Sequence, residues 1–358
     1  MKGYDSAGVP VFQATQYISS PYRNVNNSDL LSLSDKLKKI GARKIMLMLP
    51  DGLKPRVFDI VSFLSRQFSI LVSSDPFYGA CDIGNPALYS GVDAIVQFGH
   101  SPIPNINYPI PVIFQEYRLT EFPEIQESAL AVIRNAGYSK VGLLASIQYL
   151  DMLPVIKKKL EGMGLSAVIG KQDGRMAYPG QVLGCNFSAA HSVASEVDCY
   201  LVVSTGKFHA IGAQLSGERE AFLLDVSLGT VTSMKAETDL FLRRRYARIS
   251  SALNSRKFAV VVDTKIGQYR IRLADLIASQ LQSLGKEYVI LHTDQFNASD
   301  IMNCMADAVI FTGCPRVSID DYDRFPFPIL TPNEFQSLFG FKKSSRYVLD
   351  EIVSVDMI

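Results

Sequence analysis

Three short runs of consecutive hydrophobic residues, each opened by a lysine, recur along the chain. They cover residues 44–49, 140–145 and 257–262. Uninterrupted apolar runs of this length are typical of strands that are covered on both faces, as in a parallel sheet. The pattern therefore predicts the first strand of three separate α/β units.

The residues after each run repeat the same order of elements. A hydrophobic stripe with spacings of three and four predicts a helix with one buried face, and a second strand follows at 69–72, 166–169 and 288–291. Later in each unit an aspartate precedes a third apolar run that ends at or near a glycine, at 93–99, 198–206 and 307–313. The three helical stripes are Val57, Ile60, Val61 and Leu64; Leu153, Ile156, Leu160 and Met163; and Leu273, Ile277, Leu281 and Leu284.

Strand, helix, strand, helix and strand in this order is typical of α/β domains with a parallel sheet between two helical layers. The sequence thus predicts an α/β fold of three similar, small three-layer domains with parallel sheets around a central site. We place the domains at residues 1–115, 116–232 and 233–358. The length of 358 residues and the hydrophobic share of 47% suit several well-buried cores.

Charge and end sequences exclude several classes of protein. The chain has 36 basic and 35 acidic residues, for a net charge of +1, so it lacks the basic excess of an electrostatic nucleic-acid binder. No run approaches the roughly 18 apolar residues of a membrane span, and the first residues lack the apolar core of a signal peptide. We therefore expect a cytoplasmic protein without direct contact to nucleic acid or membrane.

Three of the five cysteines stand out, because each predicted domain contains one in a glycine-flanked turn. Cys81, Cys185 and Cys314 lie about a hundred residues apart, and ligands of open α/β sheets gather at the carboxyl ends of strands. If the domains face one another, three thiolates could meet, which suits an iron–sulfur cluster better than structural zinc with its four, commonly paired, ligands. Spacing alone leaves open that they are small buried residues, which we expect for Cys199 and Cys304.

Six short segments resemble the archaeal enzyme of the first step of diphthamide biosynthesis, the 2-(3-amino-3-carboxypropyl)histidine synthase family. The resemblance runs in order over about residues 30–340, and its most specific parts are Tyr-Gly-Ala-Cys-Asp at 78–82 and Gly-Lys-Phe-His at 206–209. The segments are Pro-Asp-Gly-Leu-Lys at 50–54, Asp-Pro-Phe-Tyr-Gly-Ala-Cys-Asp at 75–82, Gly-His-Ser at 99–101, Gly-Gln-Val-Leu-Gly-Cys at 180–185, Ser-Thr-Gly-Lys-Phe-His at 204–209 and Gly-Cys-Pro-Arg at 313–316.

The resemblance implies a three-domain homodimer with a [4Fe–4S] cluster, which uses S-adenosylmethionine and an external electron donor. It implies that the cluster cleaves the sulfur–Cγ bond of S-adenosylmethionine, giving a 3-amino-3-carboxypropyl radical and methylthioadenosine. The group is then transferred to a histidine of translation elongation factor 2. Carried onto this chain, the cluster ligands and catalytic cysteines are Cys81, Cys185 and Cys314.

Five further residues are candidates for holding the cofactor, each with a structural alternative. Asp51 and Gly52 follow the first strand, where a glycine permits close backbone approach and an aspartate caps a helix equally well. His100 and His209 follow strand ends and suit either a cofactor contact or a structural hydrogen bond. Gln268 follows the first strand of the third domain and could donate to the cofactor carboxylate.

Two other functions compete with the transferase. A quinolinate synthase-like enzyme also has three similar domains with one cluster cysteine in each, although the segments at 79–82 and 206–209 argue against it. A non-catalytic partner subunit of the transferase is the second alternative, and the presence of all three cysteines speaks against that role.

Overall fold

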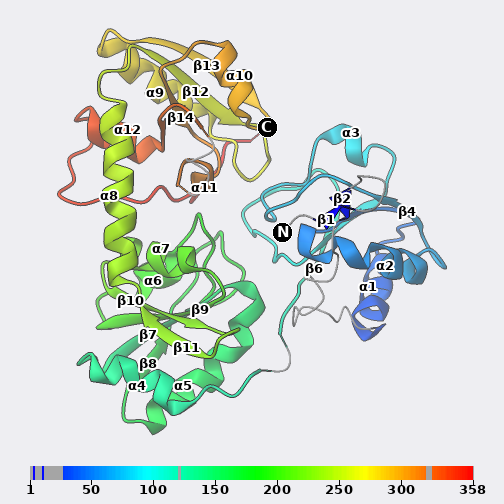
Figure 1. Cartoon of the computed structure of the whole chain (residues 1–358). Coiled ribbons are helices and arrows are strands. Elements are labelled where there is room, and N and C mark those ends of the chain that lie inside the picture. Colours follow the sequence, from blue (N-terminus) through cyan, green and yellow to red (C-terminus); the bar gives the residue numbers. More distant parts are fainter. Residues whose placement is uncertain (1–2, 5–9, 12–26, 120–121, 320–324, 358) are drawn as a thin grey trace.

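The structure is a computed structural model that describes residues 3–4, 10–11, 27–119, 122–319 and 325–357. Its strands form three parallel-dominated sheets, one in each predicted segment, and a short antiparallel pair of β1 (Gly3–Tyr4) and β2 (Pro10–Val11). Figure 1 shows the three sheets with their helices as separate bodies around a common centre. The predicted α/β class is confirmed, and we name the segments 1–115, 116–232 and 233–358 the first, second and third domains.

The first domain contains the sheet β4-β3-β5-β6, in which all strands run parallel. Its first strand and the helix after it lie where the hydrophobic pattern predicts them. The elements are α1 (Asn27–Lys39), β3 (Lys44–Met48), the 3₁₀ segment η2 (Asp51–Arg56), α2 (Val57–Leu64), β4 (Ser69–Val72), α3 (Pro86–Tyr89), β5 (Ala94–Phe98) and β6 (Val112–Gln115).

The second domain repeats this order of strands and adds an antiparallel edge strand, giving β8-β7-β9-β10-β11. The predicted first helix follows a 3₁₀ segment, as in the first domain. The elements are α4 (Glu127–Asn135), β7 (Lys140–Ala145), η3 (Ile147–Met152), α5 (Leu153–Gly162), β8 (Ser166–Ile169), α6 (Ser188–Val193), β9 (Cys199–Ser204), α7 (Lys207–Gly217), β10 (Glu220–Asp225) and β11 (Thr230–Ser233).

The third domain has the parallel sheet β13-β12-β14-β15. Helix α8 runs between the second and third sheets (Figure 1), so the exact domain boundaries stay a prediction. The elements are α8 (Lys235–Ser251), β12 (Lys257–Asp263), α9 (Ile271–Ser283), β13 (Glu287–Thr293), α10 (Ala298–Asn303), β14 (Ala308–Phe311), α11 (Pro315–Ile319), β15 (Ile329–Leu330) and α12 (Pro332–Leu338).

The aspartate that recurs before the third strand has one structural role in all three domains. Its carboxylate accepts hydrogen bonds from the two backbone N–H groups at the start of the first strand, and its own N–H donates to the lysine carbonyl there. These bonds tie the start of the third strand to the start of the first strand, at the amino-terminal end of the sheet. This end lies opposite the one where ligands gather. The acceptors and donors are Asp93 with Arg43 and Lys44, Asp198 with Ser139 and Lys140, and Asp307 with Arg256 and Lys257, at 2.7–3.0 Å.

The central strands of each sheet are buried on both faces, because successive side chains of a strand point to opposite sides, whereas the edge strands β4 and β13 are mostly exposed. In the first domain Ile45 and Leu47 pack against α1 and α2, while Met46 and Met48 pack against the connection that contains Phe77. Covered on both faces, the strands need the uninterrupted apolar sequence from which they were predicted.

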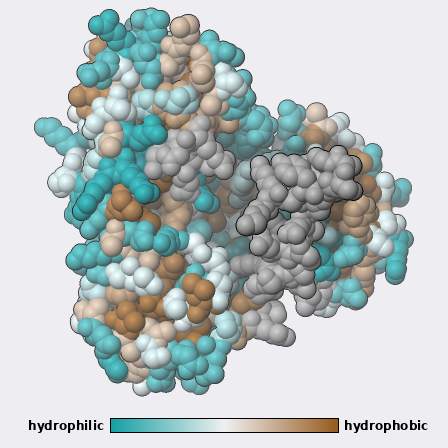
Figure 2. All heavy atoms as spheres, viewed as in Figure 1, coloured by the Kyte–Doolittle hydropathy of each residue, from teal (hydrophilic) through white to brown (hydrophobic). Residues whose placement is uncertain are grey.

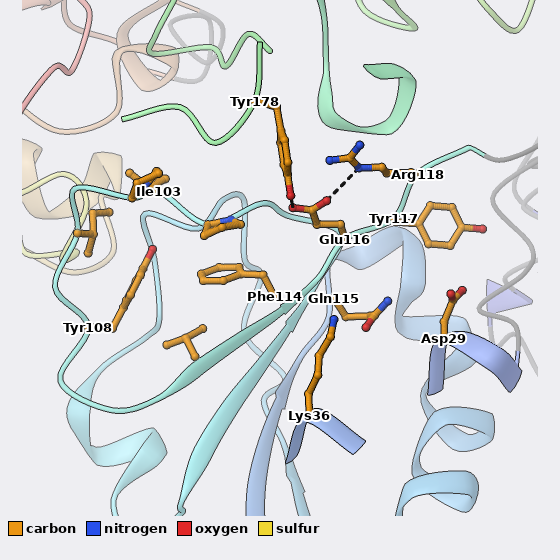
Figure 3. A pocket seen from close by; sticks show the side chains of 14 residues that line it. Asp29, Lys36, Ile103, Tyr108, Phe114, Gln115, Glu116, Tyr117, Arg118 and Tyr178 are labelled. Atoms are coloured by element: carbon orange, nitrogen blue, oxygen red, sulfur yellow. Dashed lines mark hydrogen bonds and ion pairs between the residues drawn. The ribbon is translucent and has the colours of Figure 1, made fainter. Parts of the chain in front are cut away.

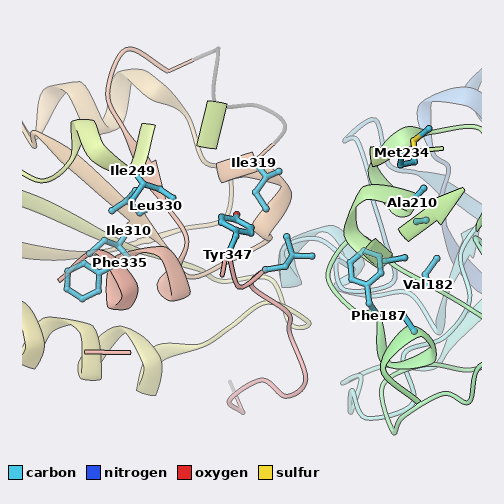
Figure 4. Packing of buried hydrophobic residues seen from close by; sticks show 14 of the residues in the cluster. Val182, Phe187, Ala210, Met234, Ile249, Ile310, Ile319, Leu330, Phe335 and Tyr347 are labelled. Atoms are coloured by element: carbon cyan, nitrogen blue, oxygen red, sulfur yellow. The ribbon is translucent and has the colours of Figure 1, made fainter. Parts of the chain in front are cut away.

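One hydrophobic cluster joins the second and third domains. It contains Phe187 and Val202 from the second domain and Val260 and Phe335 from the third, and Figure 4 shows its two ends. The outer face in Figure 2 carries hydrophobic residues in small patches among hydrophilic ones. Among the described residues, no helix has both the length and the apolar character needed to cross a membrane.

Candidate functional site

Cys81 lies in the connection between β4 and β5 and is fixed by contacts from the third domain. Its carbonyl accepts a hydrogen bond from the N–H of Gly267 at 2.9 Å, and its Sγ accepts one from Nε2 of Gln268 at 3.3 Å. The preceding carbonyl, of Ala80, accepts from the Tyr108 hydroxyl at 2.8 Å. The turn that carries Cys81 is therefore held against the loop that follows β12.

Cys185 lies at the tip of a small hairpin in the connection between β8 and β9. Leu183 and Asn186 form the pair that closes this hairpin, and Asn186 donates to the carboxylate of Asp173 at 2.9 Å. The carbonyl of Cys185 accepts from the N–H of Ile352 at 2.8 Å. The hairpin is thus fastened on one side to its own domain and on the other to the C-terminal segment of the chain.

Cys314 directly follows the carboxyl end of β14, as predicted, and opens α11. The buried guanidinium of Arg270 donates to the carbonyls of Thr312 and Gly313, at 2.6 and 3.1 Å. Arg270 is itself paired with the buried carboxylate of Asp350 at 2.7 Å. A neutralised arginine therefore holds the turn in which Cys314 lies.

The three thiols are free of disulfides and lie close enough for each to affect another's pKa. Burial, together with the nearby Cys185, raises the pKa of Cys81 to about 12. Burial also raises the pKa of Cys314, to which both Cys185 and Cys81 add. Three mutually repelling, desolvated thiolates need a positive charge among them, and bound iron supplies one and deprotonates its thiol ligands.

This arrangement fits a cluster better than a single ion. Within the described part of the chain, no group of three or more His, Cys, Asp or Glu side chains is placed to hold one metal ion. In a cubane each cysteine binds a different iron, so its three thiolate ligands do not converge on one ion. That Cys81, Cys185 and Cys314 are the ligands stays a prediction.

Arg175 is a residue of this site that the sequence did not indicate. It follows β8 in the second domain, and only 1% of its surface is exposed. Its Nη2 donates to the Gly267 carbonyl at 2.7 Å, while Nε and Nη1 have no hydrogen-bond partner among the described residues. Burial raises the pKa of the Cys185 thiol, and the Arg175 charge acts against that rise. An arginine in a turn is ordinarily solvent-exposed, which is why its role could not be predicted.

The two candidate histidines are uncharged at neutral pH. Burial lowers the pKa of His100, just after β5, to about 4, and its Nδ1 has no hydrogen-bond partner in the described part of the structure. Burial, together with the Arg316 charge, lowers the pKa of His209 to about 4. His209 Nδ1 lies 3.3 Å from the hydroxyl of Ser204, at the end of β9. Both neutral rings can therefore accept a hydrogen bond, and their contact with a cofactor stays a prediction.

The other three candidates lie in different surroundings. Gln268 is buried, and its amide donates to Cys81 rather than lying free for a carboxylate, while its Oε1 has no partner among described residues. Asp51 is 69% exposed and forms an ion pair with Lys54 at 2.7 Å within η2. A Cβ at Gly52 would meet nothing within 4 Å, so the protein itself does not require a glycine there. For all three, contact with a cofactor stays a prediction.

A cavity of about 730 Å³ shares a wall with Cys81. Ile103, Ile106 and Tyr108 line it and also pack against the cysteine. Farther out, Figure 3 shows Tyr178 and Arg118 both directed at the carboxylate of Glu116, with contacts of 2.6 and 2.9 Å. The cavity therefore lies where the first and second domains adjoin, one side chain away from the cysteine site.

Comparison with known proteins gives the same assignment as the motifs. The 2-(3-amino-3-carboxypropyl)histidine synthase of Pyrococcus horikoshii is 30% identical over 321 residues, covering 89% of this chain and 91% of that enzyme. The enzyme of the same name from Methanocaldococcus jannaschii is 29% identical, with 87% of this chain and 88% of the relative covered. Subunit 1 of the mouse enzyme is 24% identical over 90% of this chain and 73% of its own length.

A solved structure extends the likeness to the whole fold. The crystal structure of Dph2 from Pyrococcus horikoshii with a 4Fe-4S cluster matches with a TM-score of 0.81 and 28% identity, covering 91% of this chain and 94% of that one. Residues 49–348 match the family model described as "Putative diphthamide synthesis protein". The chain therefore belongs to the family of diphthamide synthesis proteins.

Proposed function

We propose that this protein transfers a 3-amino-3-carboxypropyl group from S-adenosylmethionine to a histidine of translation elongation factor 2. Cys81, Cys185 and Cys314 would hold a [4Fe–4S] cluster that leaves one iron open. The observation that carries the proposal is that three partly buried thiols, one from each domain, lie close enough to affect one another's pKa, in a chain whose relatives bear the synthase name. We also propose that it acts in the cytoplasm as a homodimer, with electrons from an external donor.

The bound cluster would supply the electron that cleaves the sulfur–Cγ bond. The chain's own residues would keep the thiolates dry, orient the cofactor and handle protons. His100 and His209 are neutral at pH 7, because their pKa values lie near 4. As neutral imidazoles they can accept a hydrogen bond from the acceptor histidine or the cofactor amino group, whereas a pKa near 4 makes them weak proton acceptors at pH 7. Gln268 would hold Cys81 in one orientation through its Nε2 contact at 3.3 Å.

The proposal is tested on anaerobically purified, reconstituted chain. We expect about four irons per chain and, after reduction with dithionite in the presence of S-adenosylmethionine, methylthioadenosine as the product. The Cys314→Ala variant should lose most of its iron, whereas Cys304→Ala should retain it, because Cys304 is exposed and not buried as the sequence led us to expect. Absence of iron in the wild-type protein, or 5′-deoxyadenosine as the main product, would contradict the proposal.

Membership in the diphthamide synthesis family favours the transferase over a quinolinate synthase-like activity. The second alternative, a non-catalytic partner subunit, predicts that the chain alone gives no methylthioadenosine even with a full complement of iron. The same experiment therefore separates the catalytic from the supporting role.

A further inference from the structure

Arg175 occupies a position where all three domains touch. Its Nη2 donates to the carbonyl of Gly267 in the third domain at 2.7 Å, and the N–H of that same glycine donates to the carbonyl of Cys81 in the first domain at 2.9 Å. A Cβ on Gly267 would lie 2.4 Å from the Cys81 Cα, so the two backbones are in direct contact. The Arg175 guanidinium and Cys81 are therefore both bonded to the same residue, Gly267.

The turn that carries Arg175 is fastened to the Cys185 hairpin. The carboxylate of Asp173 accepts from the Arg175 N–H at 2.9 Å and from the side chain of Asn186 at 2.9 Å. Asn186 directly follows Cys185 in the sequence. The guanidinium thus has fixed positions relative to two of the three cysteines, and its charge acts on the thiols of both.

Two features show that this arginine has unused binding capacity. Its Nε and Nη1 are buried without a hydrogen-bond partner among the described residues, and the guanidinium also interacts with the Cys185 thiol, whose pKa this contact lowers. None of its contacts with those residues is an ion pair with a carboxylate, whereas Arg270, whose charge also acts on Cys185, is neutralised by Asp350 at 2.7 Å. A buried guanidinium with unpaired N–H groups costs free energy unless an anion or another acceptor meets it.

We propose that Arg175 is a positioning residue that donates its unpaired N–H groups to sulfur atoms of the cluster held by Cys81, Cys185 and Cys314, and that its charge raises the cluster's reduction potential. The inference rests on the proposed function, because it needs a cluster at these cysteines. Reduction adds one electron to the cluster, taken from dithionite in the test, and the added negative charge is stabilised by a fixed cation nearby. Hydrogen bonds to sulfur and local charge are two of the means by which proteins set such potentials.

The test compares midpoint potentials, measured by redox titration followed with electron paramagnetic resonance, at equal iron content. In Arg175→Gln a polar side chain is kept but the charge is gone, so we expect a more negative potential than in the wild type. In Arg175→Lys the charge returns, and the potential should move back toward the wild-type value. The control Gln181→Leu removes another buried contact between domains, the 2.6 Å bond to Ser101, without changing charge, and should leave the potential unchanged.

The outcomes separate this inference from the proposed function. A wild-type protein that binds no iron overturns both. Equal potentials in the wild type and Arg175→Gln overturn the role of Arg175 alone. If Arg175→Gln binds no cluster, Arg175→Lys decides: a cluster with near wild-type potential supports the inference, and no cluster overturns it in favour of a purely structural link between the domains.

Discussion

Gly267 has no side chain, and this allows the backbone of the third domain to contact the backbone of the first. The glycine N–H bonds to the Cys81 carbonyl at 2.9 Å, and an added Cβ would lie 2.4 Å from the Cys81 Cα and 2.7 Å from Ile106 Cδ1. Backbone atoms cannot yield as a flexible side chain can, so any larger residue must push the two domains apart.

The Gly267→Ala variant should therefore lose iron although no ligand is changed. Overpacking at such a contact costs about 1–3 kcal/mol, and the displaced Cys81 would no longer meet the other two thiols. The measurement is iron per chain after anaerobic reconstitution. Gly162→Ala is the matched control, since a Cβ there meets nothing within 4 Å. Full iron content in Gly267→Ala would show that this contact does not fix Cys81.

Some residues of the site could be predicted from the sequence and others could not. The glycine-flanked turns made Cys81, Cys185 and Cys314 predictable as a group, because each domain repeats the setting. Arg175 and the Arg270–Asp350 pair were missed, since charged side chains are normally exposed and nothing local marks a buried one. Their burial depends on contacts between residues far apart in the sequence, 92 positions for Arg175 with Gly267 and 80 for Arg270 with Asp350.

At the scale of elements, the repeated aspartate explains why three strands open alike. Asp198 accepts from the N–H groups of Ser139 and Lys140 at 3.0 and 2.8 Å, and its counterparts do the same in the other sheets. The sequence showed that the aspartates and the strands recur together, but not that hydrogen bonds join them. The central strands were predictable because both of their faces are buried, whereas pairing across a sheet requires the fold.

We predict that Asp198→Ala destabilises the second domain by about 1 kcal/mol at pH 7, after allowance for solvent screening of these bonds. Backbone hydrogen bonds lower the pKa of this carboxyl below its ordinary value of 3.8. Because the folded-state pKa is lowered, the stabilisation is present above the unfolded pKa and is lost as the pH falls through the folded one.

The difference between wild type and Asp198→Ala should hence be constant near neutral pH and shrink below about pH 4. Urea unfolding followed by circular dichroism at several pH values measures it. A difference that stays the same at low pH would mean that the lost stability has another origin than the ionised carboxylate.

At the scale of the whole molecule, the C-terminal segment (residues 342–357) contacts both the first and the second domain. The Ile352 N–H donates to the Cys185 carbonyl at 2.8 Å, and the Val353 carbonyl accepts from Asn105 of the first domain at 3.0 Å. The Glu351 carboxylate accepts from the N–H of Phe187 at 2.7 Å and contacts His191 at 2.7 Å. The sequence of this segment carries no motif, so its role follows only from where the chain returns.

Glu351→Ala should weaken the hold of this segment on the Cys185 hairpin. The substitution removes the acceptor of the half-buried hydrogen bond from the Phe187 N–H, which costs about 1–3 kcal/mol. The three sheets keep their own hydrogen bonds. We expect unchanged secondary structure by circular dichroism and faster loss of iron to a chelator. Lys343→Ala, an exposed change in the same segment, is the control. Iron that leaves both variants at the wild-type rate would mean that Cys185 is positioned by its own hairpin and by Arg175 alone.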